Sequence, residues 1–146
     1  MTDASTRIDF YILGAAGAGA RERFACRLAE KAFGLGHRVH ALTASAEQAH
    51  RLDELMWTFR AGSFVPHAID SDAANADTPI TIGFDDPAGA EGDLLINLPD
   101  EVPPCFDRFQ RVAEIVDGSD AGKQAGRSRF RIYRDNGYPP DTHHIN

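Results

Sequence analysis

Four basic side chains near the end of the chain are spaced so that they could act together on an anion. Lys123, Arg127, Arg131 and Arg134 follow one another at helical steps, so they share one face of a helix. Phe130 lies beside this stripe of cations. One interpretation is a solvated face whose cations pair with acidic residues elsewhere in the chain. The other is a groove for an anionic, aromatic-bearing peptide end, because guanidinium groups form forked hydrogen bonds with carboxylates.

A second pattern with chemical potential is a set of glycines. Gly14, Gly17 and Gly19 follow an expected strand and precede an expected helix, where glycine lets a backbone approach a pyrophosphate. Their spacing is GxxGxG rather than GxGxxG, and the next expected strand ends without an acid that would hold a ribose hydroxyl. We favour a simple turn. The alternative is a nucleotide-binding α/β enzyme that uses the Gly14–Gly19 loop.

Metal binding and nucleophilic catalysis find little support in the sequence. His37 and His40 lie on an expected strand at a separation that points them to opposite faces. His143 and His144 would need further ligands. No GxSxG turn is present to expose a nucleophilic serine. We therefore expect no metal site, no cofactor and no catalytic residues.

The stretch from Arg51 to His67, RLDELMWTFRAGSFVPH, gathers large apolar side chains around the only tryptophan. It begins with helical spacing and breaks at Gly62, and Pro66 bars further helix. The apolar side chains are those of Met56, Trp57, Phe59, Phe64 and Val65. They could pack in a core, or they could contact another protein, since Trp, Phe and Met are enriched at interfaces.

This stretch also resembles the most recognisable block of one protein family, the chi subunit of bacterial DNA polymerase III, a clamp-loader accessory protein. The shared features are Arg-Leu-Asp-Glu, a Trp three residues later, and then Ser-Phe-Val-Pro-His. Weaker similarity runs from about Phe10 to Tyr138. The resemblance implies a non-catalytic replication adaptor that acts as part of the polymerase holoenzyme.

The resemblance also implies two binding surfaces. In chi-like proteins the C-terminal helix and the end of the preceding strand take the C-terminal tail of the single-stranded DNA-binding protein, which is acidic and ends in a hydrophobic residue. The matching residues here are Val116, Lys123, Arg127, Phe130 and Arg131. Phe130 and Arg131 stand where chi proteins can carry Tyr and Lys. The surface implied for the psi subunit comprises Trp57 and Phe64, with their neighbours Met56 and Val65.

The composition sets the size and class of the protein. A chain of 146 residues with 42% hydrophobic residues is expected to form one domain over residues 1–146, with 1–7 and 139–146 flexible. No run approaches the roughly 18 apolar residues of a membrane span, and the N-terminus lacks the pattern of a secretion signal. Cys26 and Cys105 belong to no CxxC motif and fall in expected helical segments, so free thiols in a reduced cytoplasm are expected.

The net charge of −7 is unevenly distributed. Between Ala61 and Asp107 there are ten acidic residues and no Lys or Arg, whereas Ala121 to Arg134 holds five basic residues and no acid. An acidic body disfavours direct, non-specific binding to nucleic acid, which needs a broad basic surface. A local basic patch on such a body suits a small acidic ligand or peptide.

Strands and helices alternate along the chain. Strands are expected at Asp9–Leu13, Arg38–Thr43, Pro79–Phe84, Asp93–Leu98 and Arg111–Val116, and helices at Glu22–Phe33, from Ser45 into Trp57, after Pro103, and at Asp120–Asn136. Arg111–Val116 also has helical spacing, but its β-branched residues favour a strand. This order predicts a single-domain α/β fold with a mostly parallel sheet and helices on both faces, Rossmann-like without a nucleotide site.

Local signals place the ends of two helices. Ser45 with Gln48 predicts a capping box, Asp120 is the expected N-cap of the last helix, and Gly137 is its expected terminator. The face of the last helix expected to pack on the sheet comprises Ala121, Ala125, Ser128 and Ile132.

Overall fold

The computed structural model describes residues 6–14, 18–58, 67–69, 80–84, 92–103 and 106–145. Within these ranges the chain forms a seven-stranded sheet in the order β3-β4-β2-β5-β6-β1-β7, and every pair of neighbours is parallel. The strands are β1 Arg7–Leu13, β2 Val39–Leu42, β3 His67–Ile69, β4 Ile80–Gly83, β5 Gly92–Asn97, β6 Phe109–Val116 and β7 Asp141–Ile145. The helices are α1 Ala18–Gly34, α2 Ala46–Thr58 and α3 Asp120–Asp135, with a single 3-10 turn, η1, at Phe106–Arg108.

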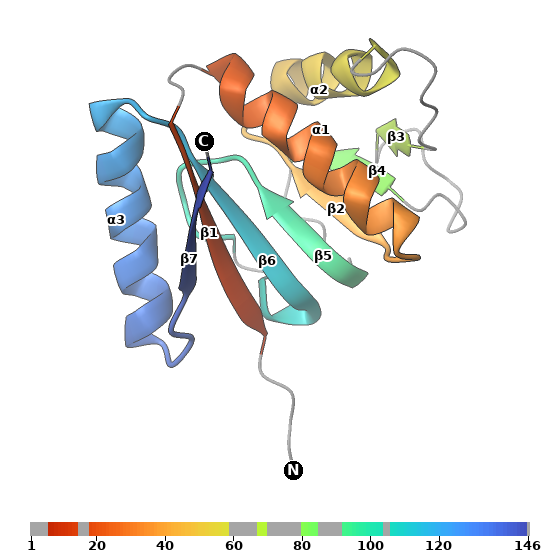
Figure 1. The fold of residues 1–146 in the computed structure, drawn as a ribbon. Helices are drawn as coiled ribbons and strands as arrows, with labels where there is room; N and C mark the ends of the chain where they lie inside the picture. Colours follow the sequence, from red (N-terminus) through yellow and green to blue (C-terminus); the bar gives the residue numbers. More distant parts are fainter. Residues whose placement is uncertain are drawn as a thin grey trace.

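The helices are divided between the two faces of the sheet. Helices α1 and α2 lie on one face and α3 lies on the other (Figure 1). Strand β6 shows the alternation: Ala113 and Ile115 belong to the core beneath α1 and α2, whereas Val112 and Val116 belong to the core beneath α3. Because both faces of β6 are buried, its sequence lacks the alternation of apolar and polar residues that is typical of a strand with one face in solvent. The predictions of an α/β fold, a parallel sheet and a strand at Arg111–Val116 are confirmed.

The chain end departs most from expectation. Residues 139–146 were expected to be flexible, but Asp141–Ile145 form β7, which pairs in parallel with β1 from Asp9 to Leu13. This strand lies at the edge of the sheet and is largely exposed or half-buried, so its residues are polar and resemble a tail. The short strand β3 at His67–Ile69 also forms where no strand was expected.

The segment after Pro103 is also different. A helix was expected after Pro103, where Phe106 and Phe109 are three residues apart, but the described part contains only the turn η1, and Phe109 already begins β6. Phe109 is buried on the α3 side of the sheet, which explains why two apolar residues at helical spacing occur here without a helix.

Local hydrogen bonds cap both ends of α3. Its N-cap is Ser119 rather than Asp120: Ser119 Oγ accepts from the backbone N–H of Gly122 at 3.0 Å. At the other end Gly137 has a φ of +90°, as expected of a terminating glycine, and the N–H of Tyr138 donates to the carbonyl of Tyr133 at 2.9 Å.

The capping box of α2 differs from the expected one in one hydrogen bond, which comes from the preceding residue. The backbone N–H of Gln48 donates to Ser45 Oγ at 3.1 Å, as expected, but Gln48 Oε1 accepts from the backbone N–H of Ala44 at 2.8 Å instead of from Ser45.

The structure bears on two expectations drawn from composition, the free cysteines and the lack of a membrane span. Cys26 is a free, buried thiol in α1, and burial together with nearby Glu22 raises its pKa to about 12. Cys105 lies outside the described residues. Across the ranges that the structure covers, no helix is both long and apolar enough to cross a membrane.

Helix α3 packs on the sheet through a different face from the one expected. Its buried residues are Gly126, Arg129 and Tyr133, whereas Ile132 is 46% exposed. A Cβ added at Gly126 would lie 2.7 Å from Val116 Cγ2, closer than real Cβ atoms approach. The absence of a side chain at Gly126 therefore sets how closely α3 approaches β6.

We expect Gly126→Ala to destabilise the protein by about 1–3 kcal/mol, because the added methyl overpacks against Val116. Alanine normally stabilises a helix by up to about 1 kcal/mol relative to glycine, so a loss of stability in this variant would show that the overpacking outweighs helix propensity. The control is Gly34→Ala in α1, where an added Cβ meets nothing within 4 Å and the change should be neutral or stabilising. Denaturant melts of both variants measure this, and a stabilised Gly126→Ala would contradict the packing argument.

On the α1 side, β7 is fastened to the sheet by a buried carboxylate. Asp9 in β1 is fully buried, and its Oδ1 lies 3.0 Å from His143 Nε2 of β7. Arg111 of β6 and Arg7 also contact it, at 3.2 and 3.1 Å. Burial alone would raise the pKa of Asp9, but the bond from His143 and the charges of Arg111 and Arg7 outweigh it, and the pKa is lowered.

We expect Asp9→Asn to lower the free energy of unfolding at pH 7 by about 1–3 kcal/mol, because it weakens charge-assisted bonds among three strands. A carboxyl whose pKa is lower in the folded state stabilises the fold above its unfolded pKa of about 4, and this contribution is lost as pH falls through the folded pKa. The difference between wild type and variant should therefore shrink below about pH 4. Urea melts from pH 3 to pH 7 measure it, and a constant difference would contradict this role for Asp9.

Candidate functional site

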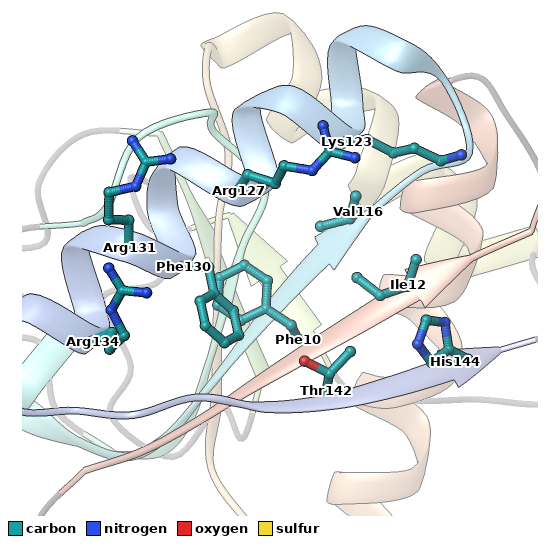
Figure 2. A pocket seen from close by; sticks show the side chains of 11 residues that line it. Phe10, Ile12, Val116, Lys123, Arg127, Phe130, Arg131, Arg134, Thr142 and His144 are labelled. Carbon is teal, nitrogen blue, oxygen red and sulfur yellow. The ribbon is translucent and has the colours of Figure 1, made fainter.

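One groove of about 510 Å³ lies between α3 and the β1–β7 edge of the sheet. Figure 2 shows basic side chains projecting from α3 on one side of it and β7 on the other. Its lining residues are Phe10, Ile12, Val116, Lys123, Gly126, Arg127, Phe130, Arg131, Arg134, Thr142 and His144.

The floor of the groove is apolar. Phe10 and Ile12 come from β1 and Val116 from the end of β6, and the half-buried Phe130 of α3 packs against Phe10 with ring centroids 5.3 Å apart. The two rings lie together at the centre of Figure 2. Gly126 adds no side chain here, and its backbone lies close to Val116. The floor can therefore take an apolar side chain from a ligand.

The rim of the groove is cationic. Lys123, Arg127 and Arg131 are exposed, and none forms an ion pair with another residue in the part of the chain that the structure describes. Arg134 pairs with its neighbour Asp135 at 3.3 Å. The interpretation in which these cations are neutralised by the acidic body is therefore not supported within the described residues. An apolar floor beneath exposed cations suits a ligand that is both anionic and apolar.

The five residues proposed from sequence for tail binding lie together here. Val116, Lys123, Arg127, Phe130 and Arg131 all line the groove, although their contact with a ligand stays a prediction.

Sequence reasoning missed the wall of the groove opposite α3. Thr142 and His144 of β7 line it, but this segment was expected to be flexible. In the structure Thr142 and His144 face the groove, and His143 between them turns to Asp9 on the other face, as the period of two in a strand requires.

Helix α3 is held over the sheet by a buried polar cluster. Arg129 Nε donates to Glu114 Oε1 of β6 at 2.7 Å, and Glu114 Oε2 accepts from Tyr133 Oη at 2.6 Å and from Asn97 Nδ2 at 2.9 Å. Burial raises the pKa of Glu114, and the charge of Arg129 with the bonds from Tyr133 and Asn97 opposes this rise. The sequence did not indicate that one of the five basic residues would be buried.

The glycine-rich loop offers no described site. Gly14 and Gly19 lie at its ends, but residues 15–17 are outside the described ranges. At the carboxyl ends of the strands, where such sheets often bind nucleotides, Arg21 of α1 donates to the backbone carbonyls of Ile115 and Leu98. No group of three or more metal-ligating side chains occurs among the described residues.

The second surface expected from sequence is only partly covered by the structure. Met56 is 7% exposed and belongs to the core beneath α1 and α2, so it packs inside the protein rather than at the surface. Trp57 is the penultimate residue of α2, but its side chain, Phe64 and Val65 lie outside the described part of the chain.

Comparison with known proteins identifies the family of the chain. The family model described as DNA polymerase III chi subunit, HolC, matches residues 5–141. The chain is 43% identical over 140 residues to DNA polymerase III subunit chi of Pseudomonas aeruginosa, covering 96% of this chain and 97% of the relative. It is 31% identical over 127 residues to the Escherichia coli subunit chi, covering 86% of each, and 32% identical over 137 residues to that of Haemophilus influenzae, covering 93% and 95%. The chain belongs to the DNA polymerase III chi subunit family, which has a role in DNA replication.

Proposed function

We propose that this protein is a non-catalytic adaptor of the DNA polymerase III clamp-loader complex, and that its groove binds the acidic C-terminal tail of the single-stranded DNA-binding protein. The observation that carries the proposal is the row of exposed cations, Lys123, Arg127 and Arg131, above an apolar floor. Membership of the chi family supports a place among the proteins of the polymerase.

The chemistry of such a tail matches the two parts of the groove. Its terminal carboxylate and acidic side chains would accept forked hydrogen bonds from Arg127 and Arg131. Its terminal hydrophobic side chain would lie on the floor near Val116 and between the groove walls, against Phe10 and Phe130. Each part alone binds weakly, because exposed charges are screened by salt and one apolar side chain buries little surface.

The charge of the whole chain favours a peptide over naked nucleic acid. With a net charge of −7, the protein repels a phosphate backbone at long range, whereas a short tail can reach the local patch on α3. The protein would then reach DNA through the single-stranded DNA-binding protein that coats it.

The adaptor needs a second contact, and we propose that Trp57, Phe64 and Val65 contact a psi-type subunit that links this protein to the clamp loader. Met56 is buried one residue before Trp57, so its role is to hold the end of α2 against the core. Trp57 is on α2, which lies on the opposite face of the sheet from α3 (Figure 1). The two partners could therefore be bound at the same time.

We expect Arg127→Ala to weaken binding of a tail peptide by about tenfold to a hundredfold, because it removes charge-assisted hydrogen bonds. The thermal midpoint should change little, since Arg127 is exposed. The matched control is Arg23→Ala, which removes an exposed arginine from α1 outside the groove and should bind as wild type. Calorimetric titration at two salt concentrations measures both, and equal losses in the two variants would indicate a non-specific charge effect.

The peptide itself provides a second test. A tail peptide without its terminal hydrophobic residue should bind at least about tenfold more weakly, because the floor loses its apolar partner. Equal binding of the full and truncated peptides would refute the groove as the site of the terminal residue.

We expect Trp57→Ala to lose a purified psi-type subunit while keeping the tail peptide, because buried tryptophans at interfaces are worth about 2–4 kcal/mol. The control is Leu35→Ala, which removes an apolar side chain that is 64% exposed after α1. Co-purification and peptide titration of both variants measure this. Retention of the psi-type subunit by Trp57→Ala would contradict the proposed second surface.

A further inference from the structure

We propose that the buried Glu114–Arg129 pair, completed by Tyr133 and Asn97, is a positioning element that fixes the rotation of α3 and so aims its cations into the groove. The inference rests on the proposed function, because the groove is the site that it serves. None of these four side chains lines the groove, so their effect on a ligand would act through the orientation of the helix.

The cluster converges on one carboxylate. Glu114 is fully buried and Arg129 is 2% exposed, and they meet at 2.7 Å. Tyr133, one helical turn after Arg129, reaches the second carboxylate oxygen at 2.6 Å, and Asn97 of β5 reaches the same oxygen at 2.9 Å. Two donors from α3 therefore bind a single acceptor on β6.

The cluster is also tied to the turn after β5. Asn97 Nδ2 donates to the carbonyl of Glu101 at 2.9 Å, and Arg129 Nη1 donates to the carbonyl of Asp100 at 3.4 Å. The anchor of α3 thus includes β6, β5 and the turn that follows β5.

Rotation matters because successive helical residues point about 100° apart. Phe130 follows Arg129 directly and faces the groove, and Arg127 and Arg131 lie two residues to either side of Arg129. A turn of α3 by a fraction of one residue step would lift the cations from the rim or push Phe130 off Phe10. The geometry of the rim therefore depends on where Arg129 and Tyr133 are held.

Apolar packing alone specifies this rotation poorly. The buried face of α3 contains Gly126 beside Val116, and the ring of Tyr133 packs on Phe10 and Phe106. Apolar contact is non-directional, so it fixes the rotation of a helix less sharply than hydrogen bonds do. Hydrogen bonds to a fixed carboxylate have directions, and a buried ion pair can supply specificity without supplying stability.

The test replaces the cluster by apolar residues of similar volume, in the variant Glu114→Leu/Arg129→Met/Tyr133→Phe. Such replacements often leave stability unchanged or raised. Asn97 keeps its bond to the carbonyl of Glu101. We expect cooperative unfolding but about tenfold weaker binding of the tail peptide, although Arg127, Arg131 and Phe130 are all retained. A folded variant that binds as tightly as wild type would overturn the proposal.

Two milder variants cover the case in which the triple variant does not fold. Arg129→Lys keeps a cation but loses the planar guanidinium that bonds both Glu114 and the carbonyl of Asp100, and Tyr133→Phe removes only the hydroxyl that donates to Glu114. Both should bind the peptide several-fold more weakly at a temperature where they are fully folded, and wild-type affinity in both would overturn the proposal.

A readout without peptide separates this proposal from the proposed function. Residual dipolar couplings of backbone amides give the orientation of α3 relative to β6, and we expect the variants to differ from wild type. If wild type fails to bind the tail peptide, the proposed function fails. If the couplings of α3 are unchanged in the triple variant, or in both milder variants should the triple not fold, the positioning role of the cluster fails.

Discussion

A parallel sheet must be covered on both faces, and the groove arises because one face of this sheet has only one helix on it. Helices α1 and α2 share one face, whereas α3 alone lies over the other (Figure 1). A helix is about 10 Å wide, and four strands from β5 to β7 span about three spacings of 4.8 Å. Helix α3 packs mainly on β6, so Ile12 of β1 stays half-buried beside it and lines the groove together with Phe10.

The position of α3 depends on two contacts of opposite character. At Gly126 the helix approaches Val116 without an intervening side chain, and at Arg129 it is bonded to a buried carboxylate. The first contact sets how closely α3 approaches β6. The second is the one that we propose to fix the direction in which the cations of α3 point. The burial of one arginine leaves the remaining basic residues of α3 to face solvent over the groove.

The sequence predicted the layering of the fold because apolar periodicity and turn residues report directly on buried strands and on the ends of helices. Strands β1, β2, β4, β5 and β6 and the three helices were expected near their observed positions. The five groove residues proposed from sequence also lie side by side, since helical spacing already places Lys123, Arg127 and Arg131 together.

The remaining features depend on tertiary contacts that no local pattern encodes. Edge strand β7 is polar, so it resembles a tail until β1 is known to lie beside it. The buried face of α3 was misplaced because Arg129 has the composition of a surface residue, and its burial requires Glu114, fifteen residues earlier. Likewise, Phe109 follows Phe106 at helical spacing, but the helical turn η1 ends before it. Phe109 instead belongs to β6, because it pairs with β5.

The wall of the groove formed by β7 has a consequence for the order in which the protein folds. The bond between His143 and Asp9 joins residues 134 positions apart, and the pairing of β7 with β1 closes a loop of similar length. Contacts between residues so far apart in sequence form slowly, because closing a long loop costs conformational entropy. An edge strand is also paired on one side only. The groove would therefore be completed late during folding and would be among the first parts to open by local unfolding, while the rest of the sheet stays closed.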